Sequence, residues 1–345
     1  MEPITAIIIG LMVLAVIAFI IWPQNGLIAI WKRYIWNVKK VLIEDALKLL
    51  YQLEENKVTA AVQNIEKSLT ISSSKANELV TQLEKIGLIT TVNNKIELTT
   101  EGRNYSLQVI RNHRLWEKYL ADETGTREID WHIEAEYAEH TLTPAQADEL
   151  AAKIGNPLVD PHGDPIPTAD GIMPDRKGIP ITELSKNDYV EIIHLEDEPT
   201  EVYEKLIAAG LYPGMHLRIK SIDNEFIHFN ADGKNIEVKS KFGQNISVAS
   251  VRLEERIEKH FRILSTLKVG ESGKVLGISS AIRGKQRRRL LDFGLVPGTT
   301  IAPRLVSFSG DPVAYTIRGT SIALRKQQAN MIFIEDDRKE KVENE

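Results

Sequence analysis

The sequence predicts a multidomain α + β protein, with helices in its N-terminal half and short strands in its C-terminal half. Apolar residues recur at helical spacing in several segments between residues 41 and 154. A segment dense in proline, glycine and aspartate begins at Gly155, and alternating strand patterns follow it. Within the strand-rich part a similar string occurs twice, at residues 205–219 and 289–303. A chain of 345 residues has room for several domains, each with its own core.

The composition excludes several classes of protein. The net charge is −5, so a nucleic acid would have to be contacted through a local patch rather than the overall field. There are no cysteines, which excludes disulfides, thiolate zinc sites and thiol catalysis. Any metal ion would therefore be held by imidazole and carboxylate. The sequence contains no P-loop, nucleophile elbow or zinc-hydrolase motif, so we do not expect an enzyme.

The N-terminus carries a long uncharged stretch at residues 4–22. As a helix it would span roughly 28 Å, about the thickness of a bilayer core. A cleaved secretory signal is the alternative, but Glu2 is the only charged side chain before the stretch and no small-x-small site follows it. Basic residues follow the stretch closely: Lys32, Arg33, Lys39 and Lys40. We therefore expect residues 1–37 to be a transmembrane anchor with an interfacial segment, placing a single-pass protein in the inner (cytoplasmic) membrane with its soluble domains in the cytoplasm.

Residues 38–105 have the element order of a winged helix-turn-helix. A helix begins near Val41, a second fits residues 62–69, and a third starts after the N-cap Ser72 and ends at Gly87. Residues 88–98 then form a hairpin. The third helix has five outward polar residues suited to DNA contact: Ser73, Ser74, Lys75, Asn77 and Thr81. Such folds also serve only for protein interaction, and this segment carries little net positive charge, so a winged helix that only dimerises stays an alternative.

The helices that follow carry two groups of potential metal ligands. His132, Glu136, Glu139 and His140 share one helix face, and His113 and Glu117 lie one turn apart on the preceding helix. Imidazole and carboxylate without thiolate suit Mn(II), Fe(II) or Zn(II). The alternative is that these are solvated acidic faces with helix-stabilising pairs.

Three strings in this region, IRNHRLWEKYL, WHIEAEYAEH and GNPLVDPHGDPIP, resemble the metal-binding and dimerisation region of the diphtheria-toxin-repressor family. The preceding TISSSKANELVTQLEKIGLI resembles the winged helix of that family, so the resemblance covers residues 38–167. It implies a metal-dependent transcriptional regulator that binds double-stranded DNA as a homodimer, with residues 106–167 as the helical metal-binding and dimerisation domain.

The resemblance also implies two ligand sets. One consists of His113, Glu117 and His132, and the other of Asp45, Glu136, Glu139 and His140. Oxygen ligands at Asp45 and Glu136 are typical of the manganese-type members, so the implied cofactor is Mn(II) or Fe(II). Lys48 departs from the family pattern, which has a second carboxylate there. Its ammonium group would replace a second cation or pair with Asp45.

The repeated strings KLIAAGLYPGMHLRI and RLLDFGLVPGTTIAP resemble FeoA-like domains, which are SH3-like small β-barrels. We expect a linker at residues 168–180, barrels at 181–250 and 262–336, and a solvated tail at 337–345. In the family a barrel can lend ligands to the metal site, and Glu198 and Glu201 are the candidates. A basic run would contact an acidic partner or a phosphate, or would be a solvated helix face: Arg283, Lys285, Arg287, Arg288 and Arg289.

The complete expectation is a multidomain α + β fold: a transmembrane helix, a winged helix-turn-helix, a helical dimerisation and metal domain, and two SH3-like barrels. Its function would be that of a membrane-tethered, metal-dependent repressor in metal homeostasis. The alternative is a membrane-bound accessory or scaffold of a ferrous-iron transport system, with the barrels docking on the transport protein. A third reading takes the barrels as modules that only stabilise a dimer.

Overall fold

The computed structural model describes residues 12, 19, 27–93, 95–175, 178–231, 234–251, 261–279 and 281–335. The chain divides into two compact units. The first comprises Met1–Asn112, Tyr137–Pro144 and Pro167–Ile172, and the second comprises His113–Glu136, Ala145–Ile166 and Met173–Glu345.

The transmembrane part of the predicted fold class, and with it the inner-membrane placement, is corrected. Apart from Met12 and Phe19, the stretch at residues 4–22 lies outside the described residues. Within the part of the chain that the structure describes, none of the helices combines the length and the apolar character needed to cross a bilayer. The long helix α2 (Leu27–Glu55) fails this requirement because charged residues recur along it, from Lys32 and Arg33 to Glu54 and Glu55.

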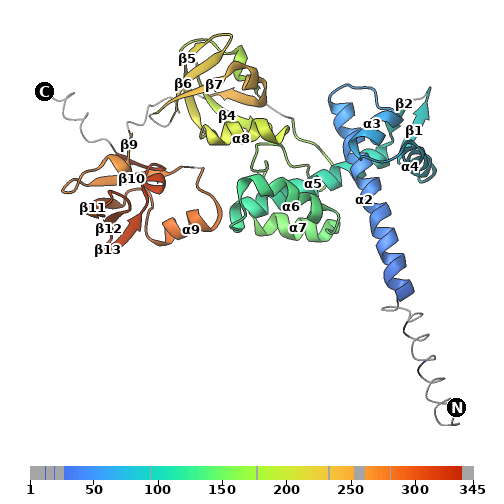
Figure 1. The fold of residues 1–345 in the computed structure, drawn as a ribbon, viewed down its shortest axis with the longest axis horizontal. Coiled ribbons are helices and arrows are strands. Elements are labelled where there is room, and N and C mark those ends of the chain that lie inside the picture. Colours follow the sequence, from blue (N-terminus) through green and yellow to red (C-terminus); the bar gives the residue numbers. More distant parts are fainter. Residues whose placement is uncertain are drawn as a thin grey trace. The chain divides into compact units, whose positions relative to one another are not determined.

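The first unit contains the winged helix (Figure 1). After α2 come α3 (Val62–Ser68), α4 (Ser73–Lys85), the antiparallel strands β1 (Ile89–Val92) and β2 (Lys95–Leu98), and the start of α5 (Thr100–Glu123). The order is the one predicted, although α2 begins well before Val41. Ser72 caps α4 by accepting a hydrogen bond from the backbone N–H of Lys75 at 3.4 Å, and Gly87 follows α4 with φ of +78°.

One apolar core holds these elements together. It includes fully buried side chains from α2, α3 and α4 and from the first strand, among them Leu47, Ile65, Leu83 and Ile89. Because α2 supplies part of this core, its position and that of α4 are linked through packing.

The helical region continues with α6 (Trp131–Glu139) and α7 (Pro144–Lys153), preceded by a 3-10 turn at Glu128–Asp130. Helices α5 and α6 each run from one unit into the other. The composition of the segment after α7 resembles a linker, yet Asp160, His162, Asp164 and Ile166 are buried. This segment is therefore part of the packed structure of the second unit.

The second unit also contains two antiparallel sheets of the SH3-like kind. The first is built from β3 (Ile179–Pro180), β4 (Tyr189–Leu195), β5 (His216–Ile222), β6 (Phe226–Ala231), β7 (Lys234–Lys239) and β8 (Ile246–Ser250) in the order β3-β8-β4-β5-β6-β7, with 3-10 turns at Ile181–Glu183 and Ser240–Asn245. Helix α8 (Thr200–Ala208) lies between β4 and β5 in the chain and packs Tyr203 and Leu206 into the core.

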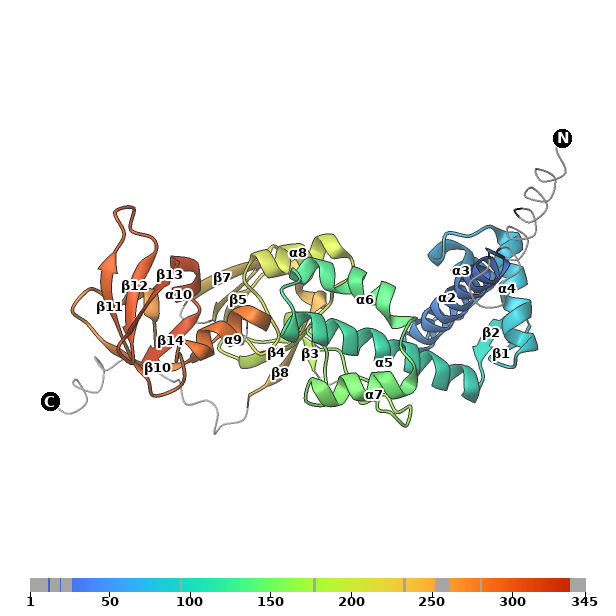
Figure 2. The same ribbon diagram turned by 90° about the horizontal axis from the view of Figure 1, so that it is seen from below.

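The second sheet repeats this arrangement (Figure 2). Its strands are β9 (Phe261–Ile263), β10 (Gly273–Ile278), β11 (Thr300–Val306), β12 (Val313–Ile317), β13 (Thr320–Leu324) and β14 (Ile332–Glu335), ordered β13-β12-β11-β10-β14-β9. Helix α9 (Gly284–Asp292) follows β10 as α8 follows β4, α10 (Lys326–Ala329) precedes β14, and a 3-10 turn occupies Leu264–Thr266. Gly210 and Gly294 end α8 and α9 with φ of +85° and +90°, which explains the shared glycine of the repeat.

Gly102 offers a test of the winged-helix packing. A Cβ added at this position of α5 would overlap the backbone carbonyl oxygen of Leu88. We expect Gly102→Ala to lower the free energy of unfolding by about 1–3 kcal/mol, despite the better helix propensity of alanine, because the core is overpacked. Gly125→Ala is the control, since no heavy atom lies within 4 Å of its added Cβ. Urea denaturation measures both, and an unchanged midpoint for Gly102→Ala would contradict this close approach.

Candidate metal centre and recognition helix

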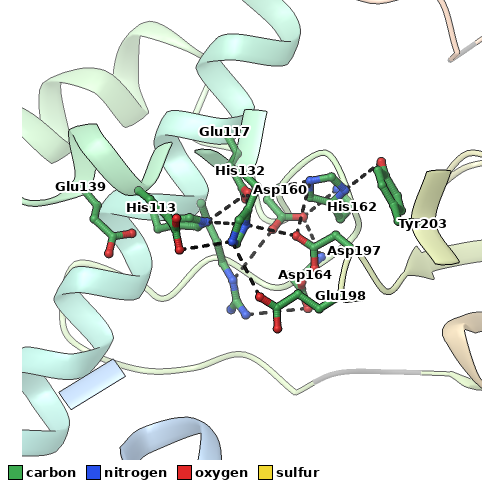
Figure 3. A network of polar contacts seen from close by, with 12 residues as sticks. His113, Glu117, His132, Glu139, Asp160, His162, Asp164, Asp197, Glu198 and Tyr203 are labelled. Carbon is green, nitrogen blue, oxygen red and sulfur yellow. Dashed lines mark hydrogen bonds and ion pairs between the residues drawn. The ribbon is translucent and has the colours of Figure 1, made fainter. Parts of the chain in front are cut away.

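The second unit brings His113, Glu117 and His132 together, as the sequence predicts. Nε2 of His113 lies 3.0 Å from Oε1 of Glu117 and 3.3 Å from Nδ1 of His132. The same Glu117 oxygen lies 3.3 Å from Nδ1 of His132 (Figure 3). Helical spacing places His113 directly above Glu117 on α5, and α6 supplies the third donor. The three donor atoms are close enough together to hold one metal ion.

The electrostatics of this group favour a cation. Glu117 is 1 % exposed, and although burial opposes its ionised form, His113 and His132 hold the pKa of its carboxyl well below the usual value. Burial likewise disfavours charged His132, but Asp197, Glu117 and Glu136 raise its pKa to about 12. Anionic oxygens thus surround the imidazole, and a divalent ion would compete with a proton for this position.

A third donor group, which the sequence analysis missed, adds His162 and Asp197 to Glu117. Nε2 of His162 lies 3.8 Å from Oε1 of Glu117 and 4.0 Å from Oδ2 of Asp197. This nitrogen is buried and neither accepts nor donates a hydrogen bond. Asp197 also lies 3.3 Å from Nδ1 of His132, so it faces both imidazoles (Figure 3).

The hydrogen bonds of Tyr203 define which ring nitrogen of His162 carries the proton. The hydroxyl of Tyr203 donates to Glu128 at 2.7 Å, so it is left to accept a hydrogen bond from Nδ1 of His162 at 3.0 Å. Burial lowers the pKa of His162, which favours the neutral ring. With its proton on Nδ1, the ring turns the lone pair of Nε2 toward Glu117 and Asp197. A buried lone pair without a partner, aimed at two carboxylates, fits a metal ligand.

Asp160 shapes the loop that presents His162. One of its oxygens accepts hydrogen bonds of 2.9 Å from the backbone N–H groups of His162, Gly163 and Asp164. Arg114 lies 3.9 Å from Asp160 and donates to the carbonyl of Pro165 at 2.6 Å. In the sequence this loop is a histidine between two aspartates in a segment whose proline and glycine content resembles a linker, although its string GNPLVDPHGDPIP also resembles the metal-binding region of the family.

The first barrel contributes an acidic group, but not the two residues expected. Asp197, rather than Glu198 or Glu201, joins the clustered donors among the described residues. Glu198 approaches His132 Nε2 at 3.9 Å, and Glu201 lies exposed in the first turn of α8.

The first unit holds a separate group of Asp45, Glu139 and His140. Nε2 of His140 lies 3.3 Å from Oδ1 of Asp45 and 3.6 Å from Oε1 of Glu139. The ammonium group of Lys48 contacts Glu139 at 3.1 Å, where the sequence suggested a pair with Asp45. Glu136, expected in this group, instead lies 3.5 Å from Nε2 of His132 in the second unit.

Glu44 is a further participant that the sequence analysis overlooked. Glu44 is 4 % exposed. Its carboxylate accepts a hydrogen bond from the hydroxyl of Tyr105 at 2.7 Å and lies 2.6 Å from Nδ1 of His140. Burial lowers the pKa of His140, but Asp45 and Glu44 raise it to about 9. A carboxylate that holds Nδ1–H orients the ring and leaves Nε2 for a metal ion. The sequence signal was a charged residue beside the buried stripe of Ala46, Leu47 and Leu50.

The predicted DNA-contacting residues all lie exposed on α4: Ser73, Ser74, Lys75, Asn77 and Thr81. The opposite face of the helix is buried through Ala76, Leu79, Val80 and Leu83. Asn77 donates to the carbonyl of Ser73 at 2.8 Å, and Thr81 to that of Asn77 at 2.9 Å, so both side chains lie along the helix.

Comparisons with known proteins agree with this architecture. Residues 99–168 match the family "Iron dependent repressor, metal binding and dimerisation domain", and residues 263–336 match the FeoA domain. The iron-dependent repressor of Mycobacterium leprae is 29% identical over 192 residues, which cover 52% of this chain and 83% of the relative. The diphtheria toxin repressor of Corynebacterium jeikeium is 30% identical over 235 residues, which cover 60% of this chain and 96% of the relative.

Among solved structures, a manganese-dependent transcriptional repressor in complex with manganese is 29% identical, with a TM-score of 0.55. The match covers 60% of this chain and 99% of that structure.

A winged helix joined to an imidazole–carboxylate centre and SH3-like barrels defines a metal-dependent regulator of transcription. The chain belongs to the family of iron-dependent repressors that includes the diphtheria toxin repressor. Its relatives are repressors rather than enzymes, which confirms that part of the sequence prediction.

The contact between Glu44 and His140 can be tested directly. We expect Glu44→Gln to weaken Mn(II) binding at the Asp45 group by about 10–100-fold, the usual effect of removing a carboxylate that orients a histidine ligand. Glu55→Gln is a matched control on the same helix, because Glu55 also receives a tyrosine hydroxyl, that of Tyr51 at 3.2 Å. Calorimetric titration measures the affinity, and nitrogen NMR of His140 reports which ring nitrogen carries the proton. Wild-type affinity in Glu44→Gln would show that Glu44 does not position the ligand.

Proposed function

We propose that the protein is a Mn(II)- or Fe(II)-dependent repressor that binds a pseudo-palindromic DNA site as a homodimer. The observation that carries this proposal is the unpartnered Nε2 of buried His162, which faces Glu117 and Asp197 beside two further imidazoles. Burying an unpaired imidazole nitrogen beside two carboxylates costs folding free energy unless a cation is bound between them.

The donor set supports a hard divalent metal. His113, Glu117, His132, His162 and Asp197 would hold one ion in the second unit, and Asp45, Glu139 and His140 another in the first. Carboxylate oxygens with imidazole, and no sulfur, favour Mn(II) or Fe(II). Relatives are named as iron-dependent and manganese-dependent repressors, and both names agree with this choice.

The group in the first unit supports a link between metal and DNA. Asp45 lies on α2, and Glu139 and His140 lie at the end of α6. When bound, the ion supplies positive charge that offsets the two carboxylates and keeps the three side chains together. Because α2 packs against α4 in one core, residues that fix Asp45 also restrict the position of the recognition helix.

Lys48 supports a single ion in this group. Its ammonium group already places one positive charge against Glu139, at 3.1 and 3.4 Å from the two carboxylate oxygens. A second ion there would meet repulsion from this charge at close range.

The FeoA match of the second barrel favours one other candidate function, that of an accessory in ferrous-iron transport whose winged helix does not read DNA. A genome-wide pull-down separates the two, because an accessory protein would enrich no DNA sequence.

Metal titration tests the proposed function. We expect Glu117→Gln and Glu139→Gln each to lose one bound Mn(II) ion, since each removes a carboxylate from one group. We also expect Mn(II) to raise operator affinity about 5–150-fold in the wild type, the usual range for coupled sites. Stoichiometry comes from calorimetry and DNA affinity from fluorescence anisotropy. Equal DNA affinity with and without Mn(II) and Fe(II) would overturn the proposal.

Lys75 tests the role of α4. If its exposed ammonium group contacts a phosphate, Lys75→Gln lowers the slope of log affinity against log salt concentration by about one unit. Lys220→Gln, which removes an equal charge from the first barrel, serves as the control. An unchanged slope for Lys75→Gln, measured by anisotropy at several salt concentrations, would exclude that contact.

A further inference from the structure

Helix α9 of the second barrel lies against the C-terminal end of α5, within the second unit (Figures 1 and 2). Gly284, the first residue of α9, has φ of +55°, and a Cβ added there would overlap the carbonyl oxygen of Thr124 and lie 3.0 Å from that of Ala121. The backbone N–H of Lys285 points to the same Thr124 carbonyl at 3.5 Å. Two backbones approach closely here, and only glycine leaves the space for it.

Two arginines flank this contact. Arg288 donates to Glu123 at 2.7 Å, and the guanidinium of Arg283 lies 5.7 Å from the ring centre of Trp131. The acidic partner that the sequence suggested for the basic run is thus supplied, for Arg288, by this same chain.

The surface under α9 is the corner between α5 and α6. Trp131 is buried at this corner, packs with Leu120 and Ala121, and donates from Nε1 to the carbonyl of Thr126 at 3.1 Å. Its ring centre lies 6.1 Å from that of His162, and the next residue in the chain is His132. The corner therefore sets the position of His132 on α6 relative to His113 and Glu117 on α5.

We propose that the second barrel is an internal clamp, whose docking through α9 on the α5–α6 corner is coupled to metal binding by His113, Glu117 and His132. The proposal rests on the metal-binding function proposed above. Docking restrains the turn between the two ligand-bearing helices, so an undocked barrel leaves the donors less well ordered and the affinity lower. Linkage then requires that the bound metal favours docking by the same factor.

Because the chain contains no cysteine, two introduced cysteines can be spin-labelled selectively, and docking can be measured in the full chain. Spin labels attached through Glu149→Cys on α7 and Thr320→Cys on β13, both exposed positions of the second unit, report the distance between the helical region and the second barrel. We expect a narrow distance distribution in the metal-free chain, and a narrower one after the chain is loaded with a diamagnetic divalent ion such as Zn(II).

Charge reversal provides the main variant. Arg288→Glu places two carboxylates together, and we expect a broader distance distribution and an affinity for Mn(II) about fivefold lower. Arg289→Glu is the matched control, because Arg289 is exposed on the same helix and contacts the ring of Phe293 rather than α5. The double variant Arg288→Glu with Glu123→Arg restores the pair and should restore both readouts.

Gly284→Ala is a second, steric variant. An exposed ion pair contributes little by itself, whereas the added Cβ must separate the two backbones, so this variant should broaden the distribution further. Circular dichroism and thermal unfolding confirm that the barrel stays folded in each variant.

The outcomes separate the two proposals. A wild type that binds no divalent metal overturns the proposed function and the clamp together. Equal Mn(II) affinity in the wild type, Arg288→Glu and Gly284→Ala, with the barrel undocked in the variants, overturns only the coupling. A broad distribution already present in the wild type shows that the barrel does not dock and overturns the clamp. The clamp is supported if Arg288→Glu and Gly284→Ala both bind Mn(II) more weakly, the double variant regains the wild-type affinity, and Arg289→Glu keeps it.

Discussion

The second unit depends on the charge of one buried carboxylate. Glu117 is almost completely removed from solvent, and burying an ionised carboxylate is unfavourable unless cationic or hydrogen-bonding partners surround it. His113 on α5 and His132 on α6 occupy these positions, whereas His162, in the loop after α7, faces the carboxylate with a neutral ring and without a hydrogen bond. The requirement to neutralise Glu117 therefore brings together segments that share no regular secondary structure.

The group in the first unit satisfies the same requirement with fixed cations. Glu139 is also buried, and Lys48 approaches both of its oxygens. Glu44 accepts a hydrogen bond from Tyr105 and lies beside Nδ1 of His140 and the ammonium group of Lys40. It too is surrounded by donors. The two groups therefore differ: one contains an imidazole nitrogen without a partner, and the other contains an ammonium group of the chain itself. This difference gives each group a separate electrostatic character.

The two barrels share a strand order and a glycine-ended helix, yet they contribute differently. The first places Asp197 and Tyr203, from the end of β4 to α8, beside the imidazoles of the second unit. The second carries its polar contacts on α9, where Gly284 and Arg288 meet the end of α5. A repeated fold thus holds two sets of functional residues, because the loop and helix between equivalent strands can change without altering the sheet.

Sequence by itself determined the features that follow from local periodicity. Helical spacing joined His113 to Glu117 and identified the exposed face of α4, and the repeated glycine–proline–glycine pattern identified two similar β domains. It failed where donors come from irregular or distant segments: His162 and Asp160 lie in a segment that resembles a linker, and Asp197 belongs to another domain. The family resemblance grouped Glu136 with His140, whereas the fold places it beside His132, one helical turn away. Only the tertiary structure decided these partners, because the energy of a buried charge depends on everything that surrounds it in space and not on its neighbours in the chain.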